Sequence, residues 1–282
     1  MKKLLVPTDF SPQANYALRS AYQLALKNQA SIHLVHVLDF PLVDEEAPVS
    51  PIEIVPGEFL QKAEEETKEQ LKNIAESKEL EDVEVTYEVR VGNPYQSIVR
   101  ALVAQKVDMV VMGSKGISGT QEMLIGSNAE RMVRFSPSPV LIIKEKADLS
   151  DIKHIVYATA LKEKEKPVIT TLAKLQEMFD AQLHIVRVNT VSNFRDDSSV
   201  RKQLKSLAET CYLKNYTLNT FSDIREEEGI IHFADEVGAD LIALATNARR
   251  GLMHLLGGSI AEDVANHAKY PVWTMSLPKV FS

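Results

Sequence analysis

Gly113-Ser114-Lys115-Gly116, followed after nine further residues by Gly126-Ser127, is the stretch of this sequence that decides the fold. It follows an apolar run over residues 107–112, which predicts a buried strand, and it opens a short helical segment over residues 126–134. Glycine-rich loops between a strand and a helix commonly hold phosphate, because glycine permits positive φ and close backbone approach, and a helix start offers unpaired N–H groups. We expect Ser127 to supply a hydroxyl at the helix cap.

The spacing of these glycines excludes two common nucleotide-binding patterns. A Walker A loop requires Gly-Lys-Ser/Thr at a fixed distance, which is missing here, and Gly113, Gly116 and Gly119 are too widely spaced for the dinucleotide pattern. An anion site at this loop therefore belongs to a different type.

The rest of the first half alternates strands with helices. We predict strands at residues 4–6, 31–38, 83–91, 107–112 and 139–143, and helices that start at Ser11-Pro12 and span residues 57–75, 94–104 and 126–134. Strands that alternate with helices of this length require a parallel sheet with right-handed crossovers.

The second half of the sequence repeats the first. An offset of 132 residues places Gly126-Ser127 on Gly258-Ser259 and Pro139-Val140 on Pro271-Val272. Nearer the start of each half, the offset that aligns the apolar strands is 151 residues. Registers that agree at several separate places indicate a duplicated domain.

The two offsets differ by 19 residues, which the first half has gained between its second and third strands. We expect most of the gain in residues 39–57, which are rich in proline and acidic side chains. A loop of this length is either disordered or a functional flap, since it leaves the edge where open α/β sheets keep their ligands.

Three motifs in the sequence resemble those of a known family. The pattern Gly-x2-Gly-x9-Gly-Ser, between a fourth strand and a fourth helix, resembles the ATP-binding signature of the universal stress protein family. Val6-Pro7-Thr8-Asp9-Phe10-Ser11 and Ser138-Pro139-Val140-Leu141 are similar to that family's first and last strands. The resemblance covers the chain twice.

The resemblance implies two tandem, doubly wound α/β domains, over residues 1–146 and 151–282. Each would hold a five-stranded parallel sheet in the order 3-2-1-4-5, flanked by helices. Members of the family commonly pair through their last strands. We therefore expect an internal pseudo-two-fold dimer, with residues 139–143 close to residues 271–275, and a further homodimer of tandem chains stays open.

The resemblance also implies that the first half binds ATP, with Mg²⁺ on the phosphates. Asp9 would contact the adenosine part, with a helix N-cap as its alternative role, and the backbone of Val37 would face adenine. Lys115 either meets a phosphate or is solvated. The expected binding residues are Pro7, Thr8, Asp9, Val37, Gly113, Ser114, Lys115, Gly116, Gly126, Ser127 and Asn128.

The second half lacks most of these features. It carries Ala160 for Asp9, Ala245 for Gly113 and Ala248 for Gly116, and only Gly258-Ser259 remains. An alanine forced to positive φ costs on the order of 1 kcal/mol, so we expect a degenerate second site and one ATP per chain. Arg249-Arg250 would either hold a different anion or face solvent.

Composition limits the remaining classes of function. A net charge of −7 argues against a nucleic-acid binder, whose domain usually has a basic face. The single cysteine excludes an intrachain disulfide, and the seven histidines show no metal-binding spacing. The apolar start of the chain is too short for a secretory signal, and no stretch reaches the roughly 18 apolar residues of a membrane span. We expect a cytoplasmic protein.

The leading hypothesis is an ATP-binding, stress-response regulatory protein with an unidentified protein partner. The alternatives are a slow ATPase or nucleotide-dependent enzyme, and a nucleotide-free scaffold. Enzymes of similar fold carry Ser-Gly-Gly-x-Asp-Ser or His-x-Gly-His at the first strand, and Thr8-Asp9-Phe10-Ser11 matches neither. We therefore assign no catalytic residue and no resident metal, although Asp9 or Glu130 would be candidates for orienting water if ATP is hydrolysed.

Overall fold

A computed structural model describes residues 1–40, 57–115, 125–246 and 260–278. The first half contains β1 (Lys3–Pro7), α1 (Pro12–Asn28), β2 (Ser31–Leu38), α2 (Gly57–Ala75), η1 (Lys78–Leu80), β3 (Val85–Val91), α3 (Pro94–Ala104), β4 (Met109–Gly113), α4 (Ser127–Phe135) and β5 (Val140–Ile143). The second half contains β6 (His154–Ala158), η2 (Glu163–Glu165), α5 (Lys166–Phe179), β7 (Gln182–Asn189), α6 (Asp197–Thr210), β8 (Tyr216–Ser222), α7 (Glu226–Glu236), β9 (Leu241–Thr246), α8 (Ile260–His267) and β10 (Val272–Ser276).

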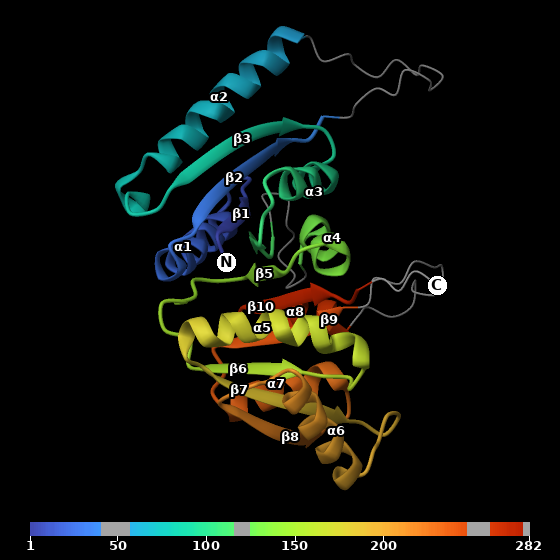
Figure 1. Ribbon diagram of the computed structural model, residues 1–282. Coiled ribbons are helices and arrows are strands. Elements are labelled where there is room, and N and C mark those ends of the chain that lie inside the picture. The colour runs from blue at the N-terminus through green and yellow to red at the C-terminus, as the bar shows by residue number, and fades with distance from the viewer. Residues whose placement is uncertain (41–56, 116–124, 247–259, 279–282) are drawn as a thin grey trace, which may run out of the picture.

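The strands form one sheet in the order β3-β2-β1-β4-β5-β10-β9-β6-β7-β8. Within each half all neighbours are parallel and follow the order 3-2-1-4-5, which confirms the predicted fold class. The halves meet where β5 and β10 pair antiparallel, with Leu141 opposite Trp273. Figure 1 shows this junction midway between the two halves, so the expected approach of the last strands is confirmed.

Two apolar cores lie on opposite faces of this sheet, because successive strand residues point to opposite sides. One core is covered by α1, α2, α5 and α6, which contribute buried Ala17, Leu71, Leu172 and Leu204 respectively. The other is covered by α3, α4, α7 and α8, which contribute Ile98, Met132, Phe233 and Val264. Each core extends from one half into the other, so the two halves share their interior.

Helices also touch across the junction on both faces. On one face the Lys27 ammonium of α1 lies 4.7 Å from the ring centroid of Phe179 in α5. On the other, Arg134 Nε of α4 lies 2.7 Å from Glu262 Oε1 of α8, and the Glu262 side chain is only 5% exposed. The junction is therefore built from a strand pair and two helix pairs.

The backbone records the duplication as well as the sequence does. Residues with positive φ recur at equivalent positions: Phe10 and Leu161, Gln29 and Asp180, and Lys106 and Gly238. Part of the extra length of the first half lies in a helix, because α2 has 19 residues and its counterpart α6 has 14. Of the proposed loop, residues 41–56 lie outside the described residues.

We predict that Trp273→Ala destabilises the whole chain. The Trp273 side chain is 1% exposed and lies on the junction strand, so its loss should lower the free energy of unfolding by about 3–5 kcal/mol. Urea unfolding followed by circular dichroism measures this. Val103→Ala, at a side chain that is 63% exposed, is the control and should change it by less than about 0.5 kcal/mol. Equal effects of the two changes would contradict this prediction.

Candidate functional site

A cleft of about 340 Å³ lies at the carboxyl edge of the first half's strands, beside the start of α4. Ten of the eleven residues expected from the sequence line it: Pro7, Thr8, Asp9, Val37, Gly113, Ser114, Lys115, Gly126, Ser127 and Asn128. Gly116 lies outside the described residues. The structure thus gathers the three separate parts of the motif around one space.

The turn after β1 fixes the position of Asp9. The Asp9 carboxylate accepts a hydrogen bond from the Ser11 backbone N–H at 3.1 Å, and Thr8 Oγ1 accepts one from the Phe10 N–H at 3.1 Å. The N-cap of α1 is Ser11, whose hydroxyl accepts from the Ala14 N–H, so the alternative of Asp9 as the N-cap is wrong. A short polar side chain that bonds to the backbone two residues on is typical of a tight turn.

Phe10 adopts a strained conformation that an aromatic neighbour supports. Its φ is 63°, which costs a non-glycine residue on the order of 1 kcal/mol or more. The Phe10 ring stacks on His36 with 4.8 Å between centroids, and His36 Nδ1 donates to the Thr8 carbonyl at 2.8 Å. Burial lowers the pKa of His36, against the opposing effects of the Thr8 carbonyl and Asp9. The neutral His36 imidazole therefore stabilises this turn through its stacking on Phe10 and its hydrogen bond to Thr8.

Gly113 is required by packing rather than by its backbone angle. Among described glycines only Gly92 and Gly238 have positive φ, so the expectation of positive φ at Gly113 is wrong. A Cβ at Gly113 would lie 2.8 Å from the carbonyl carbon of Gln13, in the first turn of α1. The glycine thus lets α1 approach the end of β4.

The start of α4 differs from the predicted cap, and its first turn lies at the cleft. Gly126 is the N-cap and makes no side-chain capping bond, so the expected cap hydroxyl of Ser127 is wrong: Ser127 is the first helical residue. The Gly126 N–H donates to the Ser114 carbonyl at 2.6 Å, which closes the loop onto the end of β4. The N–H groups of the first turn, residues 127–129, have no acceptor within the helix, and all three residues line the cleft.

Several residues that line the cleft were not predicted from the sequence. Asp39 and Pro94 line the cleft, together with the apolar side chains of Val35, Ile98 and Met112. Asp39 directly follows β2 and Asp9 is the second residue after β1, and this position just beyond a strand was the signal available in the sequence. Along the edge, carboxylates follow β1 and β2, whereas Lys115 follows β4. The cleft therefore has an acidic end and a basic end.

The second half places an ion pair at positions that correspond to His36, behind the turn after β1, and to Pro94, which lines the first half's cleft. Arg187, at the position equivalent to His36, is 5% exposed, and its Nη1 lies 3.4 Å from Glu226 Oε1. Glu226 stands where Pro94 lines the first cleft, and its other oxygen accepts from Asn193 at 3.0 Å. Burial raises the pKa of Glu226 and lowers that of Arg187, and in each case the partner's charge opposes the shift.

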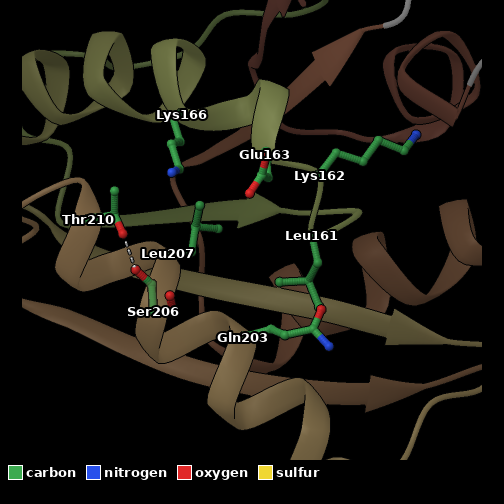
Figure 2. Close-up of a pocket in the computed structure, with 8 residues that line it drawn as sticks. All are labelled: Leu161, Lys162, Glu163, Lys166, Gln203, Ser206, Leu207 and Thr210. Carbon is green, nitrogen blue, oxygen red and sulfur yellow. Dashed lines mark hydrogen bonds between the residues drawn. The ribbon is translucent and has the colours of Figure 1, made fainter.

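A second hollow of about 260 Å³ lies between the start of α5 and α6. Figure 2 shows Glu163 and Lys166 reaching into the same gap, while the Lys162 chain extends away from it. Its polar lining on α6 includes Ser206, whose carbonyl already accepts from the Thr210 hydroxyl at 2.7 Å. Charges of both signs line this hollow, and we assign no ligand to it.

Comparison with known proteins identifies the family to which this chain belongs. The profile of the universal stress protein family matches residues 1–144 and again 151–275, so the chain belongs to that family. Universal stress protein MJ0577 of Methanocaldococcus jannaschii is 35% identical over 157 residues, covering 51% of this chain and 96% of that protein. Universal stress protein MJ0531 of the same organism is 31% identical over 149 residues, covering 51% of this chain and 82% of that protein.

A solved structure shares the tandem arrangement. The crystal structure of a universal stress protein from Archaeoglobus fulgidus superposes with a TM-score of 0.75 over 98% of this chain and 97% of that one, at 19% identity. This likeness supports the fold alone. Within the described residues, no helix is both long and apolar enough to span a bilayer, and no three His, Cys, Asp or Glu side chains cluster as metal ligands would.

We predict that Gly113→Ala strains the contact between β4 and α1. The added methyl would meet backbone atoms of Gln13, which cannot rotate away, so the free energy of unfolding should fall by about 1–3 kcal/mol. Gly57→Ala is the matched control, because a Cβ there has no neighbour within 4 Å. Thermal unfolding of both variants tests this. A Gly113→Ala protein as stable as the control would show that α1 moves freely.

Proposed function

We propose that the first half of this chain binds ATP and that the protein is a nucleotide-responsive regulator. The observation that carries the proposal is the single cleft in which the parts of the ATP-signature resemblance meet: the end of β1, the end of β2, and the loop from β4 to α4. These segments are far apart in the sequence. Their convergence on one cavity is what a shared ligand requires.

The chemistry of the cleft fits a nucleoside polyphosphate. Its volume of about 340 Å³ lies within the usual size range of ligand pockets, and its floor is apolar enough to receive a base. Carboxylates such as Asp9 can accept hydrogen bonds from ribose hydroxyls. The Lys115 side chain and the uncapped first turn of α4 both favour the negative charge of phosphates.

Mg²⁺ would enter with the nucleotide. This ion keeps several waters and is usually held by substrate phosphates with one or two carboxylates, rather than by an all-protein cage. It would neutralise phosphate charge next to the cluster of N–H donors. Of the two candidates for orienting water, Asp9 lines the cleft and Glu130 is not among the described residues that do, so the proposal is for binding and assigns no catalytic residue.

The second half acts in this proposal as a permanent dimer partner. Glu226, paired with Arg187, occupies the position of the cleft-lining Pro94, and Ala160 replaces the carboxylate of Asp9. Nucleotide binding to one half alone would change the charge of one sheet edge and leave the other unaltered. A protein partner that reads this edge would then respond to the nucleotide.

We predict a stoichiometry of one ATP per chain. Calorimetric titration of the full chain with Mg-ATP should give one class of site, because the second half has Ala160 in place of Asp9 and Ala245 in place of Gly113. Two equal sites would contradict the proposed asymmetry. If ATP binding produces no heat and ATP does not compete with a fluorescent ATP analogue, the proposed function itself is overturned.

We also predict that Asp9→Ala weakens Mg-ATP binding by at least about tenfold, because a charged hydrogen-bond acceptor contributes roughly 1.5–3 kcal/mol. Asp9→Asn is the matched control: it keeps an oxygen that can accept from the Ser11 N–H and preserves the turn. It should lose less affinity than Asp9→Ala. Unchanged titration curves for Asp9→Ala would place the nucleotide elsewhere.

A further inference from the structure

A side chain of the second half holds the backbone that leads into the first half's α4. Asn266, the penultimate residue of α8, accepts a hydrogen bond at its Oδ1 from the Ile125 N–H, with 2.7 Å between the atoms. Ile125 is 8% exposed and directly precedes the Gly126 cap. A buried N–H without a partner would cost about 1–3 kcal/mol, so this bond fixes where α4 begins.

The same residue holds a cation of the first half. Lys144 follows β5, and its Nζ donates to the Asn266 backbone carbonyl at 2.6 Å. Carbonyls in the last turn of a helix are unpaired within the helix and carry partial negative charge, which makes them good partners for an ammonium. Ile143, the neighbour of Lys144, pairs with Gly113 and accepts from the Ser114 N–H at 2.9 Å. Lys144 is not among the described residues that line the cleft, but it directly follows the strand that pairs with the end of β4, after which Lys115 comes.

The pseudo-two-fold axis provides an internal comparison. On the other side of the junction, Ser276 Oγ donates to the carbonyl of Arg134, the penultimate residue of α4, at 3.4 Å. Ser276 is equivalent to Lys144, and Arg134 to Asn266, so the contact is repeated with different chemistry. The Arg134 guanidinium instead forms an ion pair with Glu262. Among the residues that the structure describes, the Lys144 ammonium and the Asn266 amide acceptor lie on the side of the junction that faces the ATP-signature loop.

We propose that the second half completes the phosphate end of the first half's site: Asn266 is a positioning residue that sets the start of α4 and holds the Lys144 ammonium beside Lys115 for a polyphosphate. This inference rests on the proposed nucleotide binding and adds a requirement for the other half. The ligand chemistry it selects is a chain of two or more phosphates, because a monophosphate needs fewer cations.

The electrostatics of Lys144 agree with this geometry. Burial, opposed by Glu145 and helped by Lys115, lowers the pKa of Lys144 to about 8. A bound polyphosphate would stabilise the ammonium form and raise that pKa. Nucleotide binding should therefore weaken as the pH rises above about 8, where the free protein's Lys144 loses its proton.

The test is calorimetric titration of the full chain with Mg-ATP and with AMP at pH 7.5, and with Mg-ATP again at pH 9. Asn266→Ala should weaken ATP binding about tenfold, the value of one buried hydrogen bond to a neutral acceptor. Lys144→Met keeps the unbranched side chain without the charge. It should weaken ATP binding about threefold to tenfold and change AMP binding by less than about twofold. It should also remove the loss of ATP affinity between pH 7.5 and pH 9. Ser276→Ala is the matched control and should bind as the wild type does.

The outcomes separate this inference from the proposed function. If the wild type does not bind ATP, the proposed function fails and the inference fails with it. If the wild type binds but Asn266→Ala and Lys144→Met titrate like Ser276→Ala, nucleotide binding stands and the role of the second half is overturned. Circular dichroism and thermal unfolding identify a misfolded variant. Should Asn266→Ala misfold, the phosphate-number and pH dependence of Lys144→Met decide the result.

Discussion

The antiparallel pairing of β5 with β10 is the interaction on which the rest of this molecule depends. All four side chains of β5 are at most 1% exposed, so the strand could not stand at the edge of a separate sheet without exposing both apolar side chains and unpaired backbone groups. The pairing makes one sheet from two and lets each core continue across the junction. It also brings α4 against α8, which creates the Arg134–Glu262 and Ile125–Asn266 contacts.

Local sequence patterns were sufficient for the helices and strands and for a parallel sheet, whereas the strand order came from the family resemblance. The boundaries of β2, α2 and α3 agree with apolar periodicity and with proline at a helix start, because these elements bury one face against a neighbour that lies next to them in the chain. The convergence of the site residues was also predictable. In a parallel sheet the carboxyl ends of β1, β2 and β4 meet at one edge, so Asp9, Val37 and Lys115 had to come together.

What could not be predicted depends on distances between elements. The reason for Gly113 is the approach of α1 to β4, which no local pattern reports, and the sequence suggested backbone torsion instead. Asn266 lies 141 residues from Ile125 and looks like any polar residue near the end of a helix. The cap of α4 was misplaced by one residue, because glycine and serine both suit that position.

Covalent linkage of the halves has a consequence for how such a protein can evolve. In a symmetric homodimer one gene position supplies both copies of a contact, so Lys144 and Ser276 would have to be the same residue, as would Asn266 and Arg134. The tandem chain removes that constraint while keeping the axis that relates them. One copy is then free to specialise in support and the other in ligand chemistry, and neither change disturbs the pairing that keeps them together.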